Sequence, residues 1–168
     1  AGGSPWQARR VGHATIGEVV RKTLLTYWNT VAFQSLYARE AGIDLRTADV
    51  PPPSARPALD RWALAEAHRL AGEVDAALDV FDTQRAGRLI SAYVDDLSNW
   101  YVRRSRRRFW DGDPAAIATL HECLRVLTLV MAPFTPFVTD RVWQDLFVTS
   151  ADDAPDSVHL ARWPEPDP

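Results

Sequence analysis

The sequence is short of the residue types on which covalent and metal chemistry usually depend. Its 168 residues contain one cysteine, which excludes an internal disulfide and any metal site built from several cysteines. That residue, Cys123, lies among Leu120, Leu124 and Leu127, whereas a reactive thiol needs an electropositive and partly open setting. We therefore expect Cys123 to be a small buried hydrophobe rather than a nucleophile.

Other catalytic signatures are missing from the sequence as well. None of the four histidines has a second ligand at a metal-binding spacing such as His-Glu-x-x-His. The sequence contains no Gly-x-Ser-x-Gly elbow and no glycine-rich phosphate loop. Asp95 and Asp96 are adjacent, but neighbouring residues of a helix diverge by about 100° and do not face each other. Nothing in the sequence predicts an active site.

Long apolar runs are absent too. No stretch approaches the roughly 20 residues that cross a bilayer, and no signal-peptide pattern opens the chain. We therefore expect a cytoplasmic protein that has no contact with a membrane. The chain begins at Ala1 rather than at Met, which suggests a piece of a longer protein. The 46% of hydrophobic residues, seven Trp among them, suffice for the core of one domain.

Lysine is nearly absent, because 18 of the 19 basic residues are arginine and only Lys22 is lysine. The net charge of −3 conceals a split along the chain. Residues 1–110 carry 16 basic and 12 acidic groups, whereas residues 111–168 carry 3 and 10. An asymmetry of this kind indicates an interaction surface.

Apolar residues recur at the three-to-four spacing of a helix face in five segments. We expect helices over residues 15–40, 58–81, 82–110, 114–131 and 135–147, and a loop over 44–57, which contains four prolines. The fourth helix is apolar on nearly every side between Leu124 and Met131, so it should be the central one. The sequence thus predicts an all-α helical bundle over residues 15–148. A lead-in at 1–14 precedes it, and a largely irregular, acidic and proline-rich tail at 149–168 follows, with a short extended segment at 157–163.

One dense feature stands out at the end of the third helix, Asn99-Trp100-Tyr101-Val102-Arg103-Arg104-Ser105-Arg106-Arg107-Arg108-Phe109-Trp110. It places five arginines within six residues between pairs of aromatic side chains. The apolar stripe of this helix, which includes Leu97 and Trp100, is expected to end in Arg104 and Arg108. An unpaired buried charge costs several kcal/mol, so such arginines must meet either carboxylates of the same domain or an anion outside it.

Both possibilities stay open at this point. The planar guanidinium binds phosphate with two hydrogen bonds and stacks on bases, and Trp or Tyr stacks an unpaired base, so RNA is a suitable partner. The internal alternative has five candidate carboxylates: Asp82, Asp95, Asp96, Asp140 and Asp145. Composition favours neither, because the domain as a whole is not basic.

The sequence resembles the anticodon-binding helical domain of class I isoleucyl-tRNA synthetases, of the subtype shared by eukaryotic and many actinobacterial enzymes. The resemblance covers nearly the whole chain and is carried by residues 4–10, 19–30, 59–62, 96–110, 131–137 and 157–164. The arginine-rich block is its most specific part. The turn Ala132-Pro133-Phe134-Thr135-Pro136 is shared with the related valyl and leucyl enzymes.

The resemblance implies a parent ligase that activates isoleucine with ATP and esterifies it to its tRNA, with magnesium and zinc as further cofactors. The family's catalytic motifs, His-Ile-Gly-His and Lys-Met-Ser-Lys-Ser, are missing here, since His13 has no paired histidine and Lys22 is the only lysine. We therefore expect no catalytic, cofactor or metal site in this chain. By the family's order, Ala1 lies shortly after the Lys-Met-Ser-Lys-Ser loop.

The role that the resemblance leaves to this chain is to bind the isoleucine tRNA, so that its acceptor end reaches the catalytic domain of the same, monomeric enzyme. The candidate tRNA-binding residues are Trp100, Arg103, Arg104, Arg106, Arg107, Arg108 and Trp110. For Arg104 and Arg108, packing against the catalytic domain or an internal carboxylate competes with RNA. Two alternative functions remain, the equivalent domain of a valyl- or leucyl-tRNA synthetase and a protein-interaction bundle with internally paired arginines.

Overall fold

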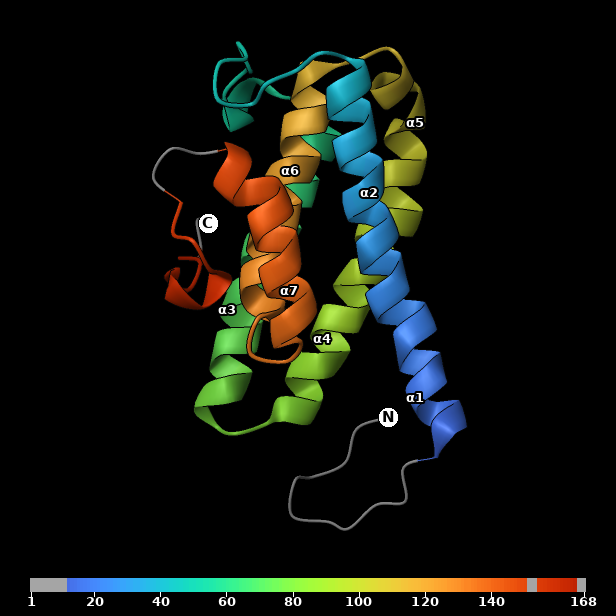
Figure 1. The fold of residues 1–168 in the computed structure, drawn as a ribbon, viewed down its shortest axis with the longest axis vertical. Coiled ribbons are helices and arrows are strands. Elements are labelled where there is room, and N and C mark those ends of the chain that lie inside the picture. Colours follow the sequence, from blue (N-terminus) through green and yellow to red (C-terminus); the bar gives the residue numbers. More distant parts are fainter. Residues whose placement is uncertain (1–11, 151–153, 166–168) are drawn as a thin grey trace.

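The structure, a computed structural model, describes residues 12–150 and 154–165 and consists of helices joined by short connections (Figure 1). Its elements are α1 (His13–Val19), η1 (Val20–Leu24), α2 (Leu25–Glu40), η2 (Pro53–Ala55), α3 (Ala58–Asp79), α4 (Thr83–Asp95), η3 (Asp96–Val102), α5 (Arg103–Trp110), α6 (Pro114–Met131), α7 (Pro136–Val142), η4 (Trp143–Phe147), η5 (Val148–Ser150) and η6 (Val158–Leu160). The segments α1–η1–α2, α4–η3–α5 and α7–η4–η5 are each continuous helices, so the predicted bundle of five helices is confirmed. The described part contains no strand. Most of the predicted lead-in, residues 1–11, lies outside the described residues, as do residues 151–153 and 166–168 of the predicted tail.

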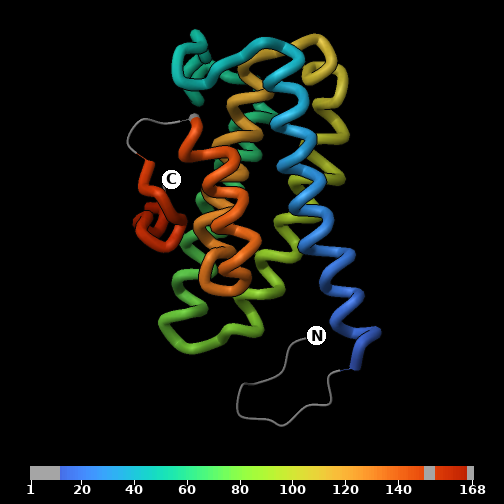
Figure 2. The backbone as a smooth tube through the Cα atoms, in the orientation of Figure 1, coloured from blue at the N-terminus to red at the C-terminus, as the bar shows by residue number. Residues whose placement is uncertain are grey.

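The five helices alternate in direction along the long axis of the molecule, so that the first, α1–η1–α2, and the third, α4–η3–α5, run the same way (Figure 2). α1 extends beyond the other helices at the lower end, and none of its residues is buried. The loop after α2 crosses the upper end and leads into α3. This arrangement places the C-terminal ends of α2 and α5 together at the end far from α1.

α6 is the centre of the bundle, as its apolar sequence predicts. Fourteen of its 18 residues are buried, and it contacts α2, α3, α5 and α7. The expectation that no stretch approaches the length of a membrane span is wrong for α6, whose 18 residues suffice by length and composition. However, 78% of this helix is buried inside the bundle, which is typical of a core helix. Cys123 is completely buried in α6, and this burial raises the pKa of its thiol to about 12. The prediction that Cys123 packs rather than reacts is therefore confirmed.

Several helix ends follow from the residues that the sequence places there. The Asp82 carboxylate accepts a hydrogen bond from the Arg85 backbone N–H at 2.9 Å and caps α4. Asp113 caps α6 in the same way, and Pro114 occupies the first helical position, where no N–H is needed. After α2 the chain turns at Gly42, whose φ of 65° favours glycine.

The proline-rich loop between α2 and α3 is held in place by a buried arginine. Arg56, only 4% exposed, donates hydrogen bonds to the Pro51 carbonyl at 2.8 Å, to the Thr119 hydroxyl at 3.0 Å and to Glu122 at 2.8 Å. Thr119 and Glu122 belong to α6, so one side chain ties the loop to the central helix. The loop prediction is confirmed, whereas this anchor was not visible in the sequence.

The predicted extended segment at residues 157–163 is wrong over its middle. Residues Val158–Leu160 form a 3-10 turn, because the Ser157 hydroxyl accepts a hydrogen bond from the His159 N–H and donates one to Asp140 at 2.6 Å. The Val158 N–H also binds Asp140, at 3.2 Å, and the Val158 side chain is 2% exposed. A local hydroxyl cap and docking onto α7 thus replace the strand partner that an alternating pattern needs.

His121 provides a test of the packing between α6 and η4. It lies in α6 with its ring centre 4.9 Å from that of Phe147, and burial, with a smaller contribution from the charge of Arg125, lowers the pKa of His121 to about 4. The unfolded chain binds a proton at this residue below about pH 6.5 while the folded protein does not, so the free energy of unfolding falls as the pH drops from 6.5 towards 4. Urea unfolding at pH 7 and 4.5 should show an extra loss of about 2 kcal/mol in the wild type compared with His121→Gln. An equal loss in both proteins would contradict the assignment.

Candidate functional site

The candidate residues lie on a helix whose winding changes midway. Between α4 and α5, η3 is π-helical, and a π-helix has more residues per turn than an α-helix. The buried face therefore continues through Leu97, Tyr101, Ser105 and Phe109, each four residues after the last. Trp100, which the sequence placed on the inward stripe, is 45% exposed, and Tyr101 occupies the core position instead. The prediction for Trp100 is wrong because the wide turn shifts the phase of the helix.

The same shift separates the five arginines. Arg103, Arg104, Arg106 and Arg107 are exposed, whereas the Arg108 side chain is only 25% exposed. The prediction that Arg104 and Arg108 both continue the inward stripe is thus right for Arg108 alone. The Arg104 guanidinium carbon instead lies 3.8 Å from the centre of the exposed Trp100 ring, in a cation–π contact.

Arg103 and Arg106 line a hollow between the arginine-bearing helix and α2. Asn29, Thr30 and Phe33 of α2 form its opposite wall. Two guanidinium groups beside neutral hydrogen-bonding side chains suit an anion, because each guanidinium can donate two parallel hydrogen bonds to a phosphate.

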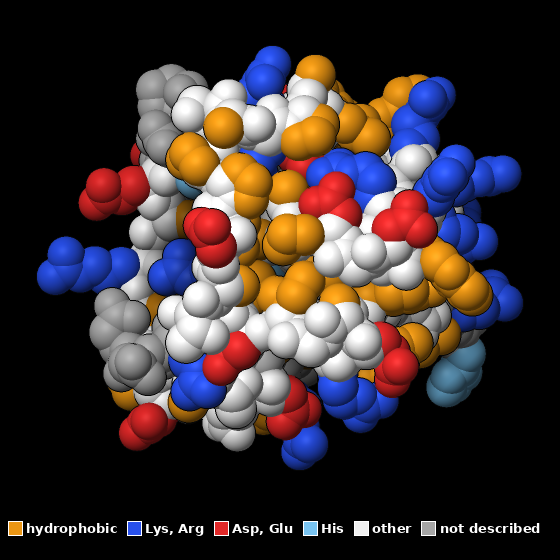
Figure 3. Space-filling model, turned by 90° about the horizontal axis from the view of Figure 1, so that it is seen from above, with side chains coloured by type: hydrophobic (Ala, Val, Ile, Leu, Met, Phe, Trp, Pro, Cys, Tyr) orange, Lys and Arg blue, Asp and Glu red, His pale blue; other side chains and the backbone are white. Residues whose placement is uncertain are grey.

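A second hollow continues the first towards α1. Asn99 borders both hollows, and the second is lined by Arg21 and Lys22 of η1 and by Arg88 of α4. Its one acidic lining residue, Asp95, accepts a hydrogen bond from Asn99 at 2.6 Å. We call the two hollows together the basic groove and define it by Arg21, Lys22, Arg88, Arg103 and Arg106. Seen end-on, Lys and Arg side chains gather along the edge of the molecule on the side where α5 lies (Figure 3).

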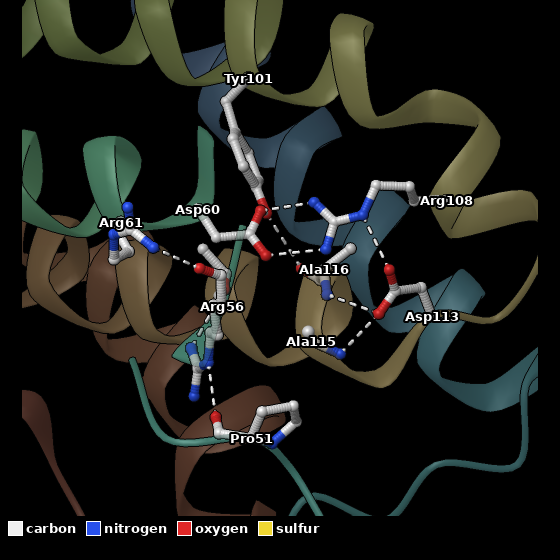
Figure 4. A network of polar contacts seen from close by, with 10 residues as sticks. Pro51, Arg56, Asp60, Arg61, Tyr101, Arg108, Asp113, Ala115 and Ala116 are labelled. Atoms are coloured by element: carbon white, nitrogen blue, oxygen red, sulfur yellow. Dashed lines mark hydrogen bonds and ion pairs between the residues drawn. The ribbon is translucent and has the colours of Figure 1, made fainter. Parts of the chain in front are cut away.

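Arg108 belongs to a network inside the bundle (Figure 4). Its two terminal nitrogens donate to the two oxygens of Asp60 at 2.6 and 2.7 Å, and its Nε donates to Asp113 at 2.8 Å. Asp60 is completely buried in the first turn of α3, and the Tyr101 hydroxyl donates to it at 3.0 Å. Asp113 is the cap of α6, so Arg108 joins α5 to the starts of α3 and α6.

The protonation states of this network follow from its contacts. The hydrogen bond and the charge of Asp60 raise the pKa of Arg108 further above its ordinary value. Burial and the neighbouring Asp60 charge raise the pKa of Tyr101, which stays a neutral donor. Burial alone would raise the pKa of Asp113, but the hydrogen bond and charge of Arg108 outweigh it and lower that pKa. At neutral pH Arg108 is therefore a charged guanidinium, and Asp113 is an ionised acceptor beside it.

The sequence did not identify the carboxylates that pair with Arg108. None of the five carboxylates it suggested pairs with Arg108. Asp82 caps α4, Asp95 accepts from Asn99, Asp96 is exposed on η3, Asp140 binds the tail and Asp145 pairs with Arg141. A signal for Asp60 was nevertheless present, because it precedes Ala63, Ala67 and Ala71 on the buried stripe of α3. A carboxylate on an inward face requires a partner.

The remaining two candidates, Arg107 and Trp110, are both exposed. The Arg107 side chain is 93% exposed, with Asp111 at 3.7 Å, and Trp110 is 79% exposed at the end of α5. Both are therefore free to meet a partner. Within the described residues, no group of three or more His, Cys, Asp or Glu side chains is placed to hold a metal ion.

Comparisons with known proteins agree on one family. The family model for the anticodon-binding domain of tRNA ligases matches residues 60–168. The chain is 68% identical over 167 residues to the isoleucine–tRNA ligase of Streptomyces coelicolor, 56% identical over 174 residues to that of Thermobifida fusca and 43% identical over 170 residues to that of Thermus thermophilus. These alignments cover 98–99% of the chain but only 16% of each relative.

The two neighbouring arginines Arg107 and Arg108 give a matched test of the site. Arg108→Ala leaves the buried Asp60 carboxylate without its bidentate partner and should lower the free energy of unfolding by about 3 kcal/mol. Arg107→Ala removes an exposed side chain with a long ion pair and should change it by less than about 0.5 kcal/mol. Urea unfolding at pH 7 measures both, and equal effects of the two substitutions would contradict a structural role for Arg108.

Proposed function

The chain belongs to the family of anticodon-binding domains of tRNA ligases, and from this premise we propose that it is the tRNA-binding domain of an isoleucine–tRNA ligase. In this proposal the domain binds the anticodon stem and loop of the isoleucine tRNA. The parent enzyme activates isoleucine with ATP and transfers it to that tRNA. The high identity to isoleucine–tRNA ligases favours this assignment over a valyl or leucyl counterpart.

The basic groove is the observation that carries the proposal. Arg103 and Arg106 face outward beside α2, whereas Arg108 is held by buried carboxylates. Arginines that neutralise internal charges stabilise the fold, and those that face a groove remain available to phosphates. The exposed Trp100, stacked with Arg104, adds a surface on which an unpaired base can lie.

Positioning of the RNA and recognition of its sequence require different contacts. Contacts from arginine to phosphate position a nucleic acid without reading its sequence, whereas contacts to unstacked loop bases read it. We assign the positioning role to the basic groove. Arg107, which lies beyond the groove, is a further phosphate contact in this proposal.

The parent protein supplies what this chain lacks. In the proposal, ATP with magnesium, and zinc, bind to other parts of a monomeric cytoplasmic enzyme, and the catalytic domain is the second partner of this domain. A bundle that binds only proteins is the alternative. The internal pairing of Arg108 is compatible with it, but the exposed cations of the groove favour RNA.

Salt dependence of tRNA affinity tests the groove directly. Each phosphate contact contributes to a negative slope of log affinity against log salt concentration, so Arg103→Ala and Arg106→Ala should each reduce its magnitude by roughly one. Filter binding of an isoleucine tRNA transcript at several salt concentrations measures the slope. Arg141→Ala, on α7 and outside the groove, is the matched control and should leave the slope unchanged. An unchanged slope with a lowered melting temperature in the groove variants would support the structural alternative.

Exchange of the anticodon tests whether the domain reads sequence. A transcript with the isoleucine anticodon should bind more tightly, by about tenfold, than the same transcript carrying another anticodon, because wrong bases leave polar groups of the site unpaired. Binding measured at one salt concentration keeps the phosphate contribution constant. Equal affinity for the two transcripts would leave the domain a positioning role only.

A further inference from the structure

The groove between α2 and the arginine-bearing helix has a third hollow at its far end, and the chemistry there is different. The helices run in parallel, so residues 36–41 of α2 face residues 109–112 at the end of α5. The lining consists of Leu36, Tyr37, Glu40, Ala41, Phe109, Trp110, Asp111 and Gly112. This terminal hollow contains no arginine or lysine, and its two charged residues are both acidic.

Three aromatic side chains, Tyr37, Phe109 and Trp110, line the terminal hollow. The ring centres of Tyr37 and Phe33 are 4.4 Å apart, and that of Tyr37 is 6.2 Å from Phe109, which is 1% exposed. Trp110 extends from this cluster with 79% of its surface exposed. An exposed large indole beside a fixed aromatic cluster offers a face on which a flat ligand can stack.

A close contact between the two helix ends closes the hollow. Gly112 has a φ of 68°, and a Cβ atom there would lie 3.3 Å from the Ala41 Cβ. Glycine therefore serves two purposes, the left-handed turn after α5 and the approach of this turn to α2. The approach brings Asp111 and Glu40 to the same hollow.

A phosphate does not suit this hollow, because its lining carries two carboxylates and no cation, and the nearby Arg107 lies against only one of them, Asp111, at 3.7 Å. A flat aromatic ligand that carries N–H donors does suit it, since a carboxylate can only accept hydrogen bonds at neutral pH. Adenine, guanine and cytosine each combine a stacking face with an amino group. End-on, this end of the bundle shows exposed hydrophobic side chains with acidic ones among them (Figure 3).

The position of the hollow relative to the basic groove points to the same ligand. Trp110 follows Arg106 by four residues, or about 6 Å along the helix axis, a distance that one nucleotide can bridge. A strand whose phosphates lie at Arg103 and Arg106 can thus place its next base in the terminal hollow. The basic part of the groove would then bind the phosphates of the strand, and the acidic terminal hollow would bind one of its bases.

We propose that the terminal hollow binds one unpaired, amino-bearing nucleobase of the anticodon loop, stacked on Trp110 and donating a hydrogen bond to Glu40. The other carboxylate of the hollow, Asp111, already lies 3.7 Å from the Arg107 guanidinium. The inference rests on the proposed function and deepens it, because it assigns base recognition to residues distinct from the phosphate-binding arginines. Sequence alone indicated Trp110 as a stacking group but gave no reason to include Glu40.

Removal of the stacking face is the first arm of the test. With the 168-residue chain and an isoleucine tRNA anticodon stem-loop as probe, Trp110→Ala should weaken binding about tenfold, and Trp110→Tyr should retain most of the affinity. Phe137→Ala, which removes a 90% exposed aromatic ring on α7, is the matched control and should not change it. All of these side chains are exposed, so the melting temperatures should agree with the wild type.

Removing the charge of Glu40 distinguishes two effects, because electrostatic repulsion and a lost hydrogen bond to a base change the affinity in opposite directions. Glu40→Gln removes a negative charge next to a polyanion, so electrostatics alone predicts tighter binding. Loss of a carboxylate that accepts from a base amino group predicts weaker binding, and we expect a decrease of about fivefold. Asp75→Asn, an exposed carboxylate of α3 outside the groove, is the control for the electrostatic effect. Tighter binding by Glu40→Gln would overturn the assignment.

An abasic scan identifies the base and separates the two proposals. Stem-loops that lack one loop base at a time should include one position whose removal weakens binding to the wild type but not to Trp110→Ala. Equal sensitivity of both proteins at every position would overturn the base-binding hollow and favour another occupant, such as a basic side chain of a protein partner. A wild-type chain that binds no stem-loop would instead overturn the proposed function itself.

Discussion

The buried carboxylate of Asp60 must be neutralised, and the way in which the protein does so fixes the arrangement of three helices. Arg108 supplies both of its terminal nitrogens to Asp60 and its Nε to Asp113, while Tyr101 adds a hydroxyl. Because an unpaired buried carboxylate costs several kcal/mol, the starts of α3 and α6 and the end of α5 have to lie together. The same requirement sets how α5 is rotated about its axis.

That rotation decides which side chains of the arginine-rich block are available. The π-helical turn of η3 brings Tyr101 and Phe109 into the core and turns Trp100 and Arg104 outward. With Arg108 inside, Arg103 and Arg106 are left beside α2. A π-turn in an otherwise α-helical segment is often found at a functional site. Here it separates the internally paired Arg108 from exposed arginines that adjoin it in sequence, and the proposed function gives those the binding role.

The two parallel helices form a groove whose lining changes along its length from basic to aromatic and acidic. Its basic part faces Asn29 and Thr30, and its terminal part faces Glu40. A single-stranded nucleic acid has the same two components, charged phosphates and flat bases with hydrogen-bonding edges. In the proposed function, the basic part of the groove binds the phosphates and the terminal part binds a base, so that affinity and selectivity come from different residues of the same two helices.

The sequence by itself determined the helices, their ends and the central position of α6, because apolar periodicity and caps such as Asp82 and Asp113 act locally. It also indicated a candidate binding region, the five arginines among aromatic residues, which stays a prediction. It could not show the phase shift at η3, the pairing of Arg108 with Asp60, the anchor made by Arg56, or the meeting of Glu40 with Trp110. The last three join residues 48 to 70 positions apart in the chain, and such contacts arise only when the packing of the whole bundle brings the helices together.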